Sequence, residues 1–133
     1  MDMEITFPGG KRVDAQYKGF SIQTDQSVKY GGDESAPEPF SLFLASMGTC
    51  AGIYVLSFCE KRKIPTDNIK LIQRMEDSAD GKMVAKVTIE IKLPSDFPSK
   101  YRQAVVSAAQ LCAVKKHMDN PPEFSIITSM DSE

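Results

Sequence analysis

The stretch Phe40–Lys63, FSLFLASMGTCAGIYVLSFCEKRK, decides the fold of this chain. It carries no charged residue from Phe40 to Cys59, and four charged residues follow at once from Glu60 onward. About twenty uncharged residues are enough for a helix to cross a bilayer, so a membrane span is one interpretation. The other is a helix that is apolar all round because it is buried on all sides. The flanking sequence decides between the two.

Amphipathic strands flank the stretch on both sides, because apolar and polar residues alternate there. The cleanest alternation covers residues 85–93, and Asp80-Gly81 before it is typical of a hairpin turn. Pro39 and Ile64-Pro65 bound the apolar helix. The predicted strands centre on residues 3–7, 13–17, 20–24, 69–75, 85–93 and 124–128, and the predicted helices cover about 39–63 and 99–118.

This order predicts one α+β domain over residues 1–133, with an antiparallel sheet and two main helices. A membrane span would leave an incomplete half-domain on each side, so the buried helix is the better interpretation. A domain of 133 residues has difficulty surrounding such a helix alone. We therefore expect a homodimer that shares its core around the first helix, which would be long and buried.

The composition excludes several classes of function. The 16 basic and 18 acidic residues give a net charge of −2, which does not fit a nucleic-acid-binding protein. The N-terminus, MDMEITFPGG, has acidic residues and no apolar core, unlike a signal peptide. Three cysteines do not fit a secreted disulfide framework. A cytoplasmic protein with reduced thiols and no membrane partner is the expectation.

Helical spacing separates the three cysteines. Cys50 and Cys59 lie nine residues apart, so on one helix they point about 180° apart and are separated by roughly 13 Å along the axis. They cannot form a disulfide with each other. Cys112 shares a predicted helix face with Tyr101 and Val105 and points inward, so it can meet Cys50. The alternative is that these cysteines are only small buried apolar residues.

Neither a metal site nor a local nucleophile dyad can be recognised in the sequence. There is no C-x-x-C, and the single histidine, His117, is five residues from Cys112 and points elsewhere. A reactive thiol needs a cation nearby, because burial in apolar surroundings raises its pKa. Arg12 and Arg74 are the candidates, although a surface role is the better explanation for either one taken alone. Glu38 lies at the predicted helix N-terminus, where a carboxylate is favoured by the dipole.

The segments PEPFSLFLASMGTC and AAQLCAVKKHMDNP, after an early GG loop, resemble the OsmC/Ohr superfamily over nearly the whole chain. The resemblance implies an OsmC-like α+β fold, an intertwined homodimer with active sites at the subunit interface, and thiol peroxidase activity on organic hydroperoxides in stress or detoxification. Cys50 matches the peroxidatic cysteine and Cys112 the resolving cysteine. A dithiol reductant would reset the pair, and no metal or organic cofactor is implied.

The resemblance also implies an arginine that holds the thiolate and a glutamate that orients the arginine. Arg12, or less well Lys11, matches the first, and Glu38 matches the second by its PE motif. Glu38 lies twelve residues before Cys50, whereas the family's peroxidases usually carry the glutamate ten before. The alternative function is therefore a non-enzymatic dimer that binds a small apolar ligand or acts as a thiol redox sensor.

Overall fold

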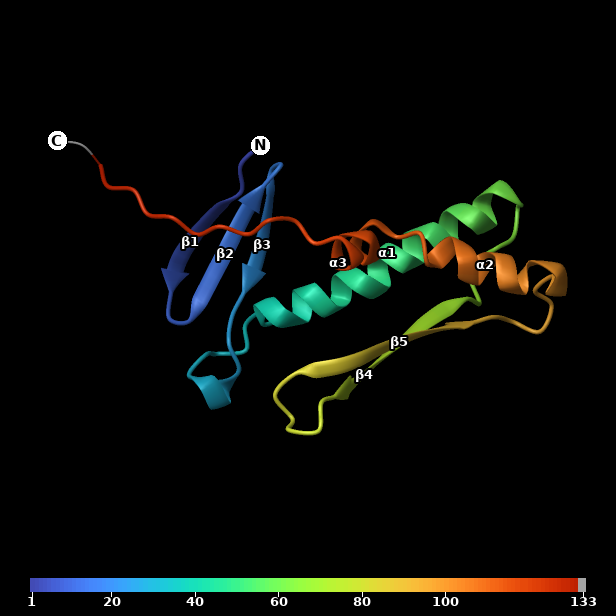
Figure 1. The fold of residues 1–133 in the computed structure, drawn as a ribbon, viewed down its shortest axis with the longest axis horizontal. Coiled ribbons are helices and arrows are strands. Elements are labelled where there is room, and N and C mark those ends of the chain that lie inside the picture. The colour runs from blue at the N-terminus through green and yellow to red at the C-terminus, as the bar shows by residue number, and fades with distance from the viewer. Residues whose placement is uncertain (132–133) are drawn as a thin grey trace. The chain divides into compact units, whose positions relative to one another are not determined.

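The computed structural model describes residues 1–131 and shows an α+β fold with antiparallel sheets (Figure 1). The chain divides into two compact units, one up to Ser46 and one from Met47 onward. The first unit holds a three-stranded sheet and the second a two-stranded sheet. The long helix α1 (Pro39–Lys61) begins in the first unit and ends in the second.

The strands predicted at residues 3–7, 13–17 and 20–24 form the N-terminal sheet, which is an antiparallel meander. Its strands are β1 (Glu4–Gly9), β2 (Arg12–Tyr17) and β3 (Phe20–Thr24), and each pairs antiparallel with the next. The turn between β2 and β3 uses Lys18 and Gly19, both with positive φ. Alternation sends apolar side chains to one face, and cross-strand register places Ile5, Ala15 and Ile22 in one row. Ile5 and Ile22 are exposed, so this apolar face is open in the single chain.

Glu38 directly precedes helix α1, and its carbonyl oxygen accepts hydrogen bonds from the backbone N–H groups of Ser41 and Leu42. Pro39 follows at the first helical position, where its missing N–H costs nothing. The helix ends at Lys61, two residues before the predicted end. Lys63 has a left-handed backbone with φ 56°, and Ile64 donates its N–H to the Cys59 carbonyl over 2.9 Å. This is the Schellman pattern that closes many helices.

The C-terminal unit builds its core on the second half of α1. Strands β4 (Lys70–Asp77) and β5 (Val84–Lys92) form the predicted hairpin, and a short 3-10 turn (Ser99–Tyr101) leads into helix α2 (Arg102–Ala109). The rings of Phe58 and Tyr101 meet edge to face, with centroids 5.7 Å apart. The buried core residues are Val55, Phe58, Cys59, Phe97 and Val105.

The prediction of one continuous helix over 99–118 is wrong. The helix breaks after α2, and a separate helix, α3 (Ala113–Asp119), follows. Cys112 between them has an extended backbone with φ −61° and ψ 144°. Its sulfur accepts a hydrogen bond from the backbone N–H of Lys115, so it caps the first turn of α3. The apolar spacing continues across the break, and it therefore resembled a single helix.

The predicted last strand over 124–128 does not form in this chain. The segment after α3 has no regular secondary structure up to Asp131, and Phe124 and Ile126 are 87% and 82% exposed. A strand exists only where a neighbouring edge takes its backbone hydrogen bonds. No described strand pairs with this segment, so its alternating pattern has no partner within one chain.

The expectation that α1 is buried on all sides is not met within one chain. Met47, Ala51 and Val55 are buried, whereas Phe43 and Ile53 are exposed. Among the described residues α1 is the one helix long and apolar enough to cross a membrane, a test that the core helix of a soluble protein also passes. Ile53 lies on the side of α1 away from the buried Ala51, and Phe43 lies near the start of the helix, so both apolar side chains are open in one chain.

Candidate functional site

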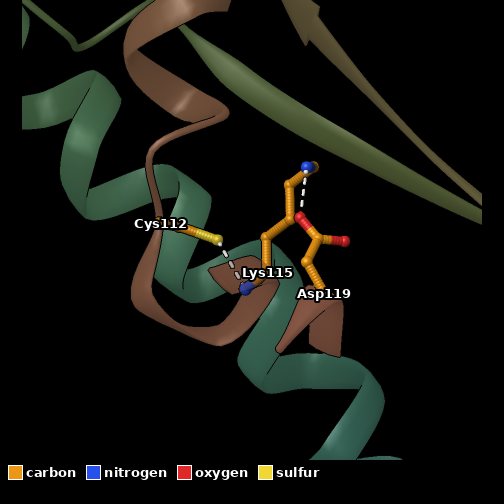
Figure 2. Close-up of polar contacts among 3 residues, drawn as sticks. All are labelled: Cys112, Lys115 and Asp119. Atoms are coloured by element: carbon orange, nitrogen blue, oxygen red, sulfur yellow. Dashed lines mark hydrogen bonds and ion pairs between the residues drawn. The ribbon is translucent and has the colours of Figure 1, made fainter. Parts of the chain in front are cut away.

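Cys50 and Cys112 belong to the same compact unit. Cys50 lies in the middle of α1 and is half-buried, and Cys112 lies in the short link between α2 and α3 and is 4% exposed. Both views show α3 beside α1 (Figures 1 and 2). All three cysteines of the chain are free thiols. The inward direction predicted for Cys112 is consistent with its burial, although it lies at a helix cap and not inside a helix.

The thiol of Cys112 is held by the first turn of α3. Its sulfur lies 3.3 Å from the backbone nitrogen of Lys115, and the Lys115 ammonium forms an ion pair of 3.0 Å with Asp119 one turn further on (Figure 2). The ion pair is exposed and adds little stability. The cap fixes the direction of the thiol without burying a charged group beside it.

Cys59 differs from the other two cysteines because it belongs to the hydrophobic core. It is 0% exposed and packs with Val55 and Phe58. Burial raises the pKa of the Cys59 thiol, although the Arg62 charge partly opposes this. The guanidinium of Arg62 covers the core here, since it lies 3.7 Å from the centre of the Phe58 ring. Cys59 is therefore a packing residue of the core.

Arg12 and Glu38 both belong to the N-terminal unit. The chain neighbour of each one is hydrogen-bonded to the dipeptide Thr24-Asp25. Arg12 precedes Val13, whose carbonyl oxygen accepts the Thr24 hydroxyl and whose cross-strand partner is Thr24. Glu38 follows Pro37, whose carbonyl oxygen accepts the Asp25 N–H over 3.1 Å. The fold thus brings the two predicted site segments to one end of the sheet. Neither Arg12 nor Glu38 forms an ion pair within residues 1–131.

The sequence prediction missed Thr24 and Asp25. Both are buried polar residues, and Asp25 is 1% exposed. A signal was present, because Asp directly after a strand and ahead of a Gly-Gly loop is typical of a turn in which the carboxylate binds backbone N–H groups.

The other titratable candidates, Arg74 and His117, make contacts with residues other than the cysteines. Arg74 on β4 forms an ion pair of 2.9 Å with Glu90, and this guanidinium together with Lys92 lowers the pKa of the Glu90 carboxyl. His117 is exposed on α3 and lies 2.7 Å from the Ala113 carbonyl oxygen. Within the part of the chain that the structure describes, no group of three or more His, Cys, Asp or Glu residues could hold a metal ion.

The model of the OsmC-like protein family matches residues 31–127, which include α1 and both predicted redox cysteines. The chain belongs to the OsmC-like protein family. Among curated proteins none matches this OsmC-like protein significantly.

Solved structures share the fold of this OsmC-like protein. A Psychrobacter arcticus protein named for an osmotic stress induced and detoxification response is 22% identical, with 86% of this chain and 85% of that chain covered and a TM-score of 0.71. The organic hydroperoxide resistance protein OsmC of Legionella pneumophila is 15% identical, with 89% of each chain covered and a TM-score of 0.53.

A third structure carries a ligand. It is an organic hydroperoxide resistance protein of Vibrio cholerae with captopril bound in one of its active sites. It is 16% identical to this chain, with 91% of this chain and 86% of that chain covered and a TM-score of 0.54. At such identities the likeness shows the α+β fold of the family.

Proposed function

We propose that this OsmC-like protein is a thiol peroxidase that reduces organic hydroperoxides, with Cys50 as the attacking and Cys112 as the resolving cysteine. The observation that carries the proposal is the contrast among the three free thiols. Cys59 is enclosed in the core, whereas Cys50 is half-buried on the long apolar helix and Cys112 is buried in the same unit. Membership of a family that includes hydroperoxide resistance proteins supports the same chemistry.

The proposed reaction has three steps. The Cys50 thiolate attacks the outer oxygen of the hydroperoxide, the O–O bond breaks, and the alcohol leaves after taking up a proton, so that Cys50 becomes a sulfenic acid. The Cys112 thiol then attacks the sulfenic sulfur, water leaves and a disulfide forms. A dithiol reductant finally reduces this disulfide by exchange and is itself oxidised.

Arg12 and Glu38 are proposed to hold the Cys50 thiolate, the arginine by its charge and the glutamate by orienting the arginine. Their approach to one end of the N-terminal sheet supports this pairing. No metal or organic cofactor enters the proposed reaction.

A homodimer in the cytoplasm is the proposed working form. Three apolar surfaces are open in one chain: the face of the β1–β2–β3 sheet, one face of α1, and the segment around Phe124. Exposed apolar surface on this scale is typical of a protein interface. A second copy that covers these surfaces would account for the charge-free sequence of α1.

Steady-state kinetics test the proposal. The purified protein is mixed with cumene hydroperoxide and an excess of a dithiol, and peroxide loss is followed for wild type, Cys50→Ser and the matched control Cys59→Ala. The expected result is rapid turnover by wild type and Cys59→Ala and none by Cys50→Ser. Equal rates for Cys50→Ser and wild type would overturn the proposal.

One observation favours a second candidate, a non-enzymatic dimer that binds a small apolar ligand or senses redox state. A preformed clamp would show an ion pair between Arg12 and Glu38. Among the described residues these two side chains form no ion pair with each other. This candidate predicts no peroxide turnover. The same assay, together with mass spectrometry of extracted small molecules, separates the two functions.

A further inference from the structure

A pocket of about 400 Å³ lies in the C-terminal unit, and the proposed reaction does not use it. Its walls come from the end of β5, from the segment that follows this strand, and from the 3-10 turn and first residue of α2. All lining residues fall between Glu90 and Arg102, within a single compact unit. Pockets that bind small molecules usually measure about 300–1,000 Å³, so this volume suits a small ligand.

The lining of the pocket is polar where it is exposed and apolar where it is buried. Phe97 is 7% exposed and belongs to the hydrophobic core, and the half-buried Leu93 packs against the same core. The exposed polar residues of the lining are Glu90, Lys92, Ser95, Ser99 and Arg102. Charged and hydroxyl groups therefore surround the mouth of the pocket, and apolar side chains form its floor.

The charges around the pocket favour an anion. Lys92 and Arg102 bring two positive charges to the lining and Glu90 brings one negative charge, whereas Asp96 does not line the pocket. The Glu90 carboxylate lies 2.9 Å from Arg74 on β4 and 3.7 Å from the Lys92 ammonium. These two cations already neutralise it, and Arg102 adds a further positive charge. The pocket therefore carries an excess of positive charge, although the whole chain has a net charge of −2.

Arg102 supplies the group that can recognise an oxyanion. A guanidinium presents its N–H donors in a planar fork, which matches two oxygens of a carboxylate or phosphate. The hydroxyls of Ser95 and Ser99 can donate to the remaining oxygens. A ligand that places its oxyanion at the mouth and a short carbon body on the floor would use both parts of the lining.

We propose that this pocket binds a small organic anion, which carries a carboxylate or phosphate group on a short apolar body. The oxyanion contacts Arg102 and Lys92, and the carbon body packs on Leu93 and Phe97. None of the lining residues is a cysteine, so the ligand binds without reacting with a thiol. The site goes beyond the proposed peroxidase function and does not depend on it.

An NMR titration of the purified protein tests the proposal. Amide signals are followed while benzoate or phenyl phosphate is added, because these probes share a phenyl body and differ in the oxyanion. Benzyl alcohol has a similar body without the charge, and inorganic phosphate has the charge without the body. The four titrations separate the contributions of the oxyanion and of the apolar body to the Kd.

The variant Arg102→Gln is compared with the matched control Lys100→Gln. Each removes one positive charge, but Lys100 does not line the pocket, and its ammonium lies 5.0 Å from the centre of the Tyr101 ring. The signals of residues 90–102 are expected to shift saturably with benzoate, phenyl phosphate or both. The Kd should rise about tenfold in Arg102→Gln, because a charge-assisted hydrogen bond is lost, and should stay at the wild-type value in Lys100→Gln. The tighter probe identifies the preferred oxyanion, and the amide spectrum of each variant shows whether it is folded.

Four results would overturn the proposal. The first is the absence of a saturable shift at residues 90–102 with either organic anion. The second is a Kd for benzyl alcohol equal to that for benzoate and phenyl phosphate, which would mean that the charge is not recognised. The third is inorganic phosphate that binds as tightly as both organic anions, which would mean that the apolar floor contributes nothing. The fourth is an equal loss of affinity in Arg102→Gln and Lys100→Gln, which would indicate general attraction to a basic surface.

Discussion

The backbone N–H of Asp25 donates a hydrogen bond of 3.1 Å to the carbonyl oxygen of Pro37, the residue before Glu38. This bond joins the end of β3 to the start of α1, and the Asp25 carboxylate organises the chain between them. Asp25 therefore fixes both ends of the loop that leads to Glu38, through its backbone N–H and through its carboxylate. The stability of this loop should depend on pH.

Acid should weaken the protein through Asp25. Its pKa is about 2 in the fold, below the ordinary value near 3.9 of an unfolded chain. A depressed pKa contributes stability that is complete above about pH 4 and is lost as the pH falls toward 2. Urea midpoints measured between pH 6 and pH 2.5 should therefore fall less steeply in Asp25→Asn than in wild type. The Asp80 carboxyl also has a lowered pKa, so Asp80→Asn is the necessary reference. Parallel midpoint curves for Asp25→Asn and wild type would contradict the role of the carboxylate.

Lys63→Gly should stabilise the protein. Lys63 occupies the left-handed position that closes α1, with φ 56°, and glycine adopts this conformation without a steric penalty. We expect the free energy of unfolding to rise by about 0.5–1 kcal/mol. Lys61→Gly is the matched control, since Lys61 is the last residue of α1 and should lose about 1 kcal/mol or less. Denaturant unfolding of both variants measures the difference, and a loss in Lys63→Gly would refute the assignment of the helix end.

Cys59 should be the least reactive thiol of the three. Full burial removes it from solvent, and burial also raises the pKa of its thiol. Iodoacetamide at neutral pH should therefore label Cys50 well before Cys59. Cys59→Ser should lower stability by about 1–3 kcal/mol, because the hydroxyl is buried among apolar groups. Peroxide turnover by folded Cys59→Ala should equal that of wild type. Comparable labelling of Cys59 and Cys50 in the native protein would show that this core opens.

Cys112 should tolerate serine better than alanine. A serine hydroxyl can accept the Lys115 N–H that the sulfur now accepts, whereas alanine leaves the first turn of α3 uncapped. We expect Cys112→Ala to lose about 1 kcal/mol relative to Cys112→Ser in thermal or urea unfolding. Neither variant should form the resolving disulfide. Equal stability of the two variants would indicate that the cap contributes nothing to the free energy of unfolding.

Local patterns in the sequence were sufficient to predict most of the fold. Alternation identified the three strands of the N-terminal meander and the β4–β5 hairpin, and Pro39 marked the start of α1. These signals are local, since they depend on side-chain periodicity and on the backbone limits of proline and glycine.

The predictions that failed depend on contacts beyond one segment. No proline or glycine marks the break between α2 and α3. The Cys112 side chain caps the first turn of α3 and so stabilises the start of this second helix. The segment around Phe124 alternates as a strand should, but a strand forms only against a partner edge. Of the candidate site, the inward direction of Cys112 could be predicted from helical spacing, and its burial is consistent with that direction. The hydrogen-bonded loop around Asp25 could not, because its donors are spread from Gln26 to Ser35 and no local pattern marks them.

Disulfide mapping tests the central claim most directly. The reduced protein is mixed without oxygen with one equivalent of tert-butyl hydroperoxide, quenched with iodoacetamide, digested, and analysed by mass spectrometry. The account predicts one cross-linked peptide pair that joins Cys50 to Cys112, with Cys59 alkylated only after unfolding. Persistence of free thiols at Cys50 and Cys112 after the peroxide is added would contradict it.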